Sequence, residues 1–298
     1  MIGIRKAFKN ARLMKALTGL TAGEFSALPP AFMEAFGASR KRRGVRVGYG
    51  RHHTLIAWEN KLFYILFYVK CYPTFDLASF VFGGVDRART HEWAHEFLPV
   101  LEKALKRKIV LPERKMRIPE EFFGRFLGIK EIWIDGTERP VKRPKDGDGQ
   151  KKRYSGKKKR HTVKNMIVSD RKKRILMVSR TRDGRQHDYS LFKKFRLPRS
   201  VPEQVKCWLD SGFQGVQKDF PELGVRMPKR AAGGHPLTER EKGRNKKISE
   251  RRVLVENAIA GVKRFRSLTD VCRNRIGSFE DRLIPVGAGL WNLHPEMS

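Results

Sequence analysis

The chain has 298 residues, and its 65 Lys and Arg against 31 Asp and Glu give a formal net charge of +34. An excess of this size indicates a polyanionic partner, above all nucleic acid, because phosphate contacts release condensed counterions. The three widely spaced cysteines argue against a zinc ribbon or disulfide framework, and the longest apolar run, LFYILFYV, is too short to span a bilayer.

Residues 1–50 mix short apolar stretches with basic ones and are interpreted as a basic N-terminal extension. Residues 51–113 are predicted to be helical, with Thr74 and Asp86 as N-caps of two helices that flank the tight turn Gly83-Gly84. This pattern is typical of a helix-turn-helix, although a helical hairpin with a solvated basic face gives it too. The residues expected to contact DNA open the second helix: Arg87, Arg89, Thr90 and His91.

From about residue 130 the apolar pattern becomes that of strands. The expected strands are KEIWID, VKNMIVSD, RILMVSR, VKCWLD and GVRMPKR. Helices are expected at HDYSLFKKF and SERRVLVENAIAGVKRFRSL, with KRPKDGDGQKKRYSGKKKRHT and REKGRNKKI as loops. Trp133 and Trp208 lie within strands and are predicted core residues. The alternation predicts a mixed sheet with helices on its faces.

Two acids stand at strand ends, Asp135 and Asp210. If their strands are neighbours, both carboxylates project from the same sheet edge. Glu256 on the last predicted helix offers a third, and Arg252 and Lys263 share its sector of about 60°. Three converging carboxylates would hold two Mg²⁺ or Mn²⁺ ions for phosphoryl displacement. Among 31 acids such a set also arises by chance, and Arg252–Glu256 is also an ordinary i,i+4 ion pair.

Five segments occur in a characteristic order: IWIDGTERPV, YSGKKKRHTVKNMIV, GRQHDYSLF, WLDSGFQG and RVLVENAIAGVKRFRSL. These segments carry a resemblance to bacterial insertion-sequence transposases of the DDE type, in the group related to Harbinger elements. The resemblance covers roughly residues 50–295. The resemblance implies an α+β chain: an all-α helix-turn-helix domain over residues 51–113, then an RNase H-like domain with a mixed five-stranded sheet over residues 125–298.

The resemblance also implies that Asp135, Asp210 and Glu256 are catalytic and bind two divalent ions, Mg²⁺ or Mn²⁺. A related signature, Y-x2-R-x3-E-x6-K, is matched at Arg252, Glu256 and Lys263. Of these, Arg252 and Lys263 are expected to contact DNA. Ser249 stands at its tyrosine position, which puts the positioning of DNA in doubt rather than the chemistry.

Other polar residues have two interpretations each. The cations Lys157, Lys158, Lys159 and Arg160 are expected to contact DNA phosphates without reading sequence, whereas in an ordinary protein such a run is a solvated face. Asp188 is predicted to cap the following helix, with a role as a fourth metal ligand as the alternative.

The function implied by the resemblance is transposition: binding of terminal inverted repeats, metal-dependent DNA cleavage and strand transfer. The expected partner is double-stranded DNA, at element ends and target, bound by a homodimer or larger assembly with no membrane involved. The expected location is cytoplasmic, associated with the nucleoid. Two alternatives remain: a catalytically inactive or domesticated DNA-binding regulator on the same scaffold, and a basic structural RNA-binding protein.

Overall fold

The computed structural model describes residues 4–42, 55–231, 236–274, 276–277 and 279–294. The chain folds into two compact units: a helical unit of residues up to Leu111 together with residues 262–294, and an α/β unit from Pro112 to Gly261. These units differ from the expected domains, in which the C-terminal segment was part of the α/β domain. Within the described residues, no helix is both long enough and apolar enough to cross a membrane.

The helical unit includes the segment that the sequence suggested to be an extension. Residues 4–42 form four helices, and Phe25 and Phe32 from them are almost completely buried. The helices of this unit are α1 (Ile4–Phe8), α2 (Ala11–Thr18), α3 (Ala22–Ser26), α4 (Pro29–Arg42), α5 (Trp58–Cys71), α6 (Phe75–Val81), α7 (Arg87–Arg107) and α13 (Phe279–Asn292). Residues 43–50 of the expected extension lie outside the described residues.

Helices α6 and α7 flank the Gly83-Gly84 turn and begin at the predicted caps. The Thr74 side chain accepts a hydrogen bond from Leu77 N at 3.1 Å, and Asp86 accepts one from Ala88 N at 2.6 Å. Gly83 and Gly84 have φ values of 94° and 70°, in the left-handed region that glycine adopts without steric cost.

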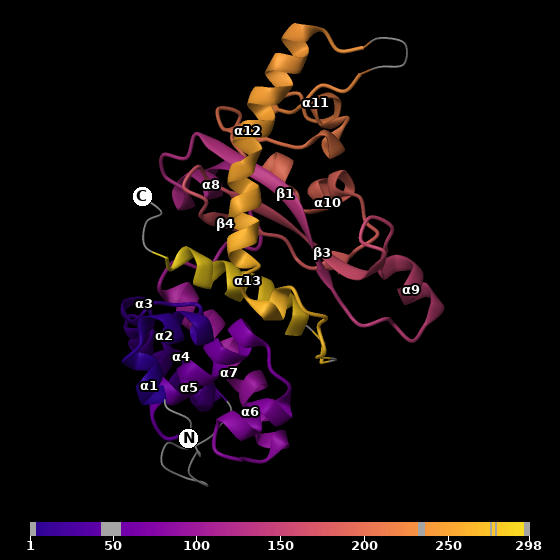
Figure 1. The fold of residues 1–298 in the computed structure, drawn as a ribbon. Coiled ribbons are helices and arrows are strands. Elements are labelled where there is room, and N and C mark those ends of the chain that lie inside the picture. Colours follow the sequence, from indigo (N-terminus) through magenta and orange to yellow (C-terminus); the bar gives the residue numbers. More distant parts are fainter. Residues whose placement is uncertain (1–3, 43–54, 232–235, 275, 278, 295–298) are drawn as a thin grey trace. The chain divides into compact units, whose positions relative to one another are not determined.

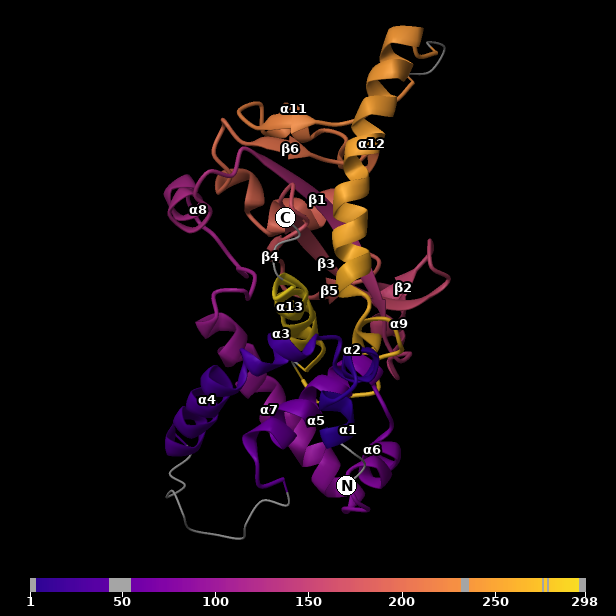
Figure 2. The same cartoon turned by 60° about the vertical axis from the view of Figure 1, so that its left-hand side comes forward.

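The α/β unit is built on a mixed sheet with the path β2-β3-β1-β6-β7 (Figures 1 and 2). Its strands are β1 (Glu131–Pro140), β2 (Tyr154–Ser155), β3 (Arg160–Ser169), β4 (Ile175–Val178), β5 (Arg182–Asp183), β6 (Lys206–Trp208) and β7 (Gly224–Arg226). Strand β1 is antiparallel to β3 and parallel to β6, and β4 and β5 pair with β3 outside this path. The predicted mixed sheet is confirmed.

Helices cover both faces of this sheet. They are α8 (Pro119–Arg125), α9 (Gly147–Arg153), α10 (Asp188–Lys194), α11 (Val216–Asp219) and α12 (Glu239–Val262). On one face, Leu191 and Phe192 of α10 join the main apolar core. On the other, α12 packs on Trp133 and Trp208, whose rings stack at 6.1 Å, and its N-terminal half extends past the sheet (Figures 1 and 2).

Two expected loops contain helices. Helix α12 begins at Glu239, so the predicted basic loop REKGRNKKI is part of it. Thr238 N donates to Glu241 Oε2 at 2.9 Å and Glu241 N donates to Thr238 Oγ1 at 3.3 Å, a reciprocal cap that fixes the start of the helix. Similarly, Asp146 caps α9 inside the long polar segment.

Candidate active site

Asp135 and Asp210 occupy matching positions on neighbouring parallel strands. Trp133 of β1 is in register with Trp208 of β6, and each acid follows its tryptophan by two residues. Because parallel strands end at the same edge, both carboxylates come to one edge of the sheet. The condition that these two strands are neighbours in the sheet is met.

Asp135 is largely buried and has negative neighbours. Burial, helped by the charges of Asp210 and Asp188, raises the pKa of its carboxyl to about 6, although the Gly136 N–H and the charge of Arg252 act to lower it. The Gly136 N–H donates to Asp135 Oδ1 at 2.7 Å. The carboxylate therefore lies where a positive ion or proton is favoured.

Asp210 is held by the turn that follows β6. Its Oδ1 accepts a hydrogen bond from Gly212 N at 2.6 Å and caps the 3₁₀ turn Ser211–Phe213. This bond fixes the carboxylate relative to the strand and leaves Oδ2 without a hydrogen bond to the described residues.

Asp188 joins this pair, although its predicted role as a helix cap is wrong. His187 is the N-cap of α10, with no side-chain capping bond, and Asp188 lies in the first turn. A Cβ atom on Gly136 would come within 2.4 Å of Asp188 Oδ1. The absence of a side chain at Gly136 therefore lets Asp188 approach β1 next to Asp135.

A buried lysine holds Asp188 in place. Lys164 Nζ lies 3.0 Å from Asp188 Oδ1 and 3.5 Å from Glu138 Oε1, and its side chain is only 9% exposed. It also donates to the Gln186 carbonyl at 2.9 Å. Burial acts to raise the pKa of Glu138, but hydrogen bonds from Ser155 and Thr162 and the charge of Lys164 keep it below its usual value.

Sequence reasoning missed Lys164 and Glu138. The available signal was a lysine inside an otherwise apolar strand, since such a residue requires a buried anionic partner. The identity of that partner depends on the pairing of β1 with β3, which sets Glu138 opposite Lys164.

The third proposed acid, Glu256, is engaged in an ion pair. It is exposed on α12 and pairs with Arg252, Nη2 to Oε1 at 3.5 Å, while the charge of Arg252 also acts on Asp135. Within the described part of the chain, no three His, Cys, Asp or Glu residues are arranged to hold a metal ion. The oxygen donors of Asp135 and Asp210 suit Mg²⁺ or Mn²⁺ in kind, but the expected third ligand is paired with a cation.

The other residues of the signature lie along or just past α12. Ser249, at the tyrosine position, is exposed on the helix. Lys263 is half-buried, follows the last residue of α12 and belongs to the helical unit.

The four helix-turn-helix residues differ in accessibility. Arg87 is exposed near Asp76, at 3.7 Å, and Arg89 is exposed and paired with Glu92 at 2.7 Å. His91 is half-buried against the ring of His95, at 4.4 Å between centroids. Thr90 is completely buried and its hydroxyl donates to the carbonyls of α6 and α7, so its predicted DNA contact is wrong.

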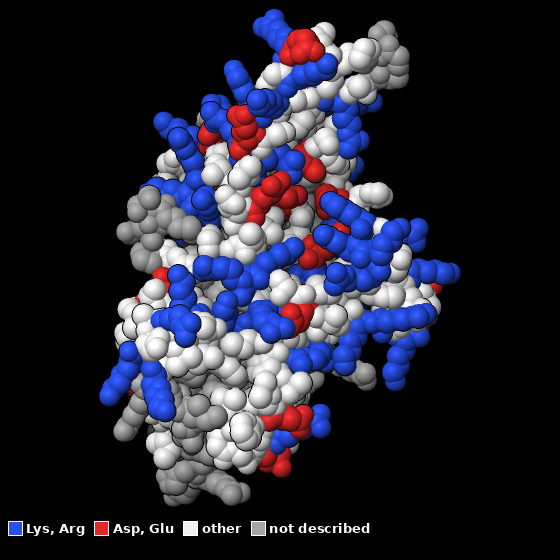
Figure 3. Space-filling view, in the orientation of Figure 1, with Lys and Arg blue, Asp and Glu red and all other residues white. Residues whose placement is uncertain are grey.

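The cations Lys157, Lys158, Lys159 and Arg160 are all exposed at the tip of the β2–β3 hairpin. Figure 3 shows many Lys and Arg side chains over this part of the molecule, near α9. Their position is open to an extended anionic ligand.

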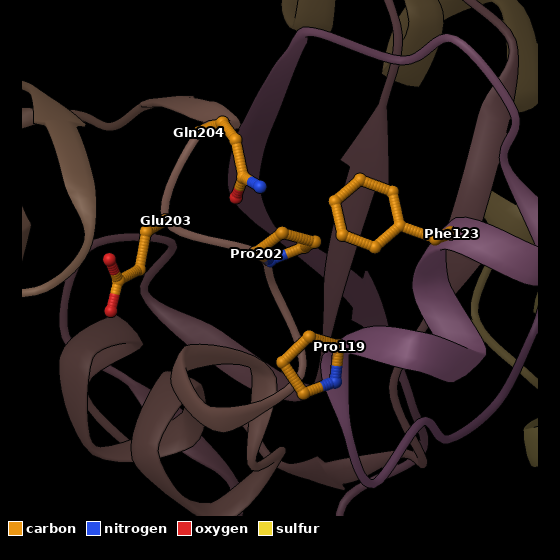
Figure 4. A pocket seen from close by; sticks show the side chains of 5 residues that line it. All are labelled: Pro119, Phe123, Pro202, Glu203 and Gln204. Atoms are coloured by element: carbon orange, nitrogen blue, oxygen red, sulfur yellow. The ribbon is translucent and has the colours of Figure 1, made fainter.

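A shallow pocket elsewhere on the α/β unit holds none of the predicted residues (Figure 4). Its lining has one carboxylate, which points away from the aromatic ring, and otherwise prolines and an amide. The lining residues are Pro119, Phe123, Pro202, Glu203 and Gln204.

Comparison with known proteins agrees with this geometry. The family described as DDE superfamily endonuclease matches residues 134–292. A probable transposase for insertion sequence element IS702 from Microchaete diplosiphon is 33% identical over 163 residues, which are 54% of this chain and 56% of that protein. The chain thus matches about half the length of this relative, and no solved structure matches. Since the family match covers more than half of the chain and includes both strand-end aspartates, the chain belongs to the DDE superfamily of endonucleases.

Proposed function

We propose that this protein is a transposase that cleaves DNA at the sheet edge carrying Asp135 and Asp210. The observation that carries the proposal is the matched position of these acids on the parallel strands β1 and β6. Asp135, Asp210 and Glu256 are the proposed catalytic and metal-binding residues, with Asp188 as a neighbour of the same site. The family match and the related transposase support this assignment.

The proposed cofactor is a pair of Mg²⁺ or Mn²⁺ ions. When bound, such ions activate a water and stabilise the charge that develops on the phosphate. Asp135 and Asp210 would hold them, because their oxygens come from rigid elements of one edge. Glu256 would join after its ion pair with Arg252 opens, and Arg252 would then contact a DNA phosphate.

The finer steps follow the resemblance. After cleavage at the element ends, the freed 3′-hydroxyl would attack target DNA at the same site. The start of α7 would contact the terminal repeats through Arg87, Arg89 and His91, and the hairpin cations would contact phosphates. Two ends must be handled together, so the active form would be a homodimer or larger assembly on DNA, at the nucleoid.

A second candidate is a DNA-binding regulator without cleavage activity. Two observations favour it: Glu256 is paired with Arg252, and Ser249 replaces the signature tyrosine. This candidate predicts DNA binding that is independent of Asp135 and Asp210.

Nicking of supercoiled plasmid by the purified protein tests the proposal. We expect nicking that requires Mg²⁺ or Mn²⁺ and falls at least 100-fold in Asp210→Asn, about 2.7 kcal/mol of transition-state stabilisation. Asp148→Asn, an exposed acid on α9, is the matched control and should retain full activity. Equal nicking by both variants would refute the site, and binding without nicking by the wild type would favour the regulator.

A further inference from the structure

The N-terminal half of α12 carries a row of cations on the helix face that is buried nearer its C-terminal end. Taking about 100° per residue, Arg240, Arg244, Lys247 and Arg251 fall within a sector of about 60°. The same sector contains Ala258 and Val262, which are buried further along the helix. The helix face that packs in the core near its C-terminal end is therefore cationic where the helix extends beyond the sheet (Figures 1 and 2).

Three of these cations have no anionic partner among the described residues. Arg240, Arg244 and Lys247 are exposed, and none forms an ion pair with that part of the chain. Arg251, nearest the sheet, lies over the Trp208 ring at 5.0 Å and 3.6 Å from Glu131. In the view of Figure 3, Lys and Arg atoms are abundant over the upper part of α12.

The acids of the same segment lie outside this row. Glu239 and Glu241 lie about 100° to either side of Arg240, and Glu250 is about 80° away. Lys242 neutralises Glu239 at 2.8 Å, and Lys229 pairs with Glu241. The face formed by Arg240, Arg244 and Lys247 is thus uniformly positive.

The extended half of the helix is held in a fixed orientation. Asn245 Oδ1 accepts from Lys229 N at 2.9 Å, and Asn245 Nδ2 donates to the Lys229 carbonyl at 2.8 Å. With the Thr238–Glu241 cap, these bonds anchor both the start and the middle of the segment. A rigid row of cations loses little conformational entropy on binding an anion with regularly spaced charges.

We infer that this face of α12, defined by Arg240, Arg244 and Lys247, is a binding surface for the phosphate backbone of duplex DNA next to the cleavage site. The inference rests on the proposed function. At 1.5 Å per residue, Lys247 and Arg240 lie about 14 and 24 Å along the helix from Glu256. With Glu256 in the proposed site and the duplex running along the helix, at about 3.4 Å per base pair, this surface would contact DNA about four to seven base pairs from the cut.

The salt dependence of duplex binding tests the inference. Each phosphate contact contributes about 0.9 to the slope of log affinity against log salt. In Arg244→Ala/Lys247→Ala we expect this slope to fall by about 1.8, measured by fluorescence anisotropy with a duplex longer than about 20 base pairs. The matched control is Arg171→Ala/Lys172→Ala, which removes two exposed cations from the β3–β4 turn and should leave the slope unchanged.

Three results would overturn the inference: an unchanged slope in the α12 variant, an equal fall in the control, or a fall confined to single-stranded DNA or RNA. Arg244→Gln/Lys247→Gln repeats the test if the alanine variant fails to fold, as judged by circular dichroism. A wild type that binds no duplex at all would contradict the proposed function itself. Normal plasmid nicking with an unchanged slope would reject only the α12 surface.

Discussion

At the residue scale, the candidate site brings several carboxylates together, and at least one of them, Asp135, is largely buried. The charges of Asp210 and Asp188 act on Asp135, and the cations that oppose them include Arg252, which acts on Asp135, and the buried Lys164, which pairs with Asp188. Carboxylates in such an arrangement repel one another unless a proton or a cation is bound. This property leads to two predictions that do not require DNA.

The first concerns the pH dependence of stability. The folded-state pKa of Asp135, about 6, lies above its ordinary value of 3.8. At pH values between these two, the folded state therefore retains a proton that the unfolded chain has released. The free energy of unfolding therefore falls as the pH rises from about 4 to 6. We expect Asp135→Asn to be more stable than wild type at pH 7 in EDTA, by about 2–3 kcal/mol, and equal near pH 4.

Urea unfolding at the two pH values measures this difference. Asp148→Asn, whose carboxyl is exposed, is the control and should match the wild type at both. A stability gain for Asp135→Asn that is the same at pH 4 and pH 7 would contradict the assigned cause, since only an ionised carboxylate is penalised by burial.

The second prediction concerns Lys164. In Lys164→Met, the carboxylates of Glu138 and Asp188 lose their shared ammonium group and remain largely out of water. Removing one partner of a buried ion pair costs about 3–5 kcal/mol, and we expect a loss of this size in urea unfolding. Lys172→Met, at an exposed turn, should change stability by less than about 0.5 kcal/mol. A loss below about 1 kcal/mol for Lys164→Met would mean that the network is not stabilising.

At the element scale, the predictable parts of the fold are those with strong local signals. The runs KEIWID and VKCWLD predict β1 and β6 because apolar residues fill them, and Thr74 and Asp86 predict helix starts because their side chains cap the backbone. The start of α12 was not predicted, since residues 239–247 are polar and are held by the Thr238 cap and Asn245 instead of by burial. Glu138 and Lys164 required knowledge of strand pairing, which no local pattern supplies.

Helix α12 gives a prediction of its own. Thr238→Ala removes one half of the reciprocal cap, which contributes about 1 kcal/mol. We expect faster amide hydrogen exchange over residues 239–247 and no change over residues 252–260, because Val255 and Ala258 remain packed. Ser249→Ala, on the exposed side of the same helix, should leave both segments unchanged. Uniform exchange along the whole helix would show that the cap does not act locally.

At the scale of the whole molecule, the net charge of +34 is consistent with the proposal that the protein holds DNA by many weak contacts and cleaves it at one place. The cationic positions are spread over both units: the start of α7, the β2–β3 hairpin and the first half of α12. The acids of the candidate site are confined to the α/β unit, where β1 and β6 bring Asp135 and Asp210 to one edge.

The most direct test of this account is to locate the proposed metal site by localised oxidation. Fe²⁺, which substitutes for Mg²⁺ or Mn²⁺ at oxygen ligands, cuts nearby backbone when ascorbate and peroxide are added, and mass spectrometry identifies the fragments. We predict cuts next to both Asp135 and Asp210, suppressed by excess Mg²⁺ and lost in Asp135→Asn. Cuts at only one of these segments, or cuts that persist in Asp135→Asn, would contradict a shared metal site at this edge of the sheet.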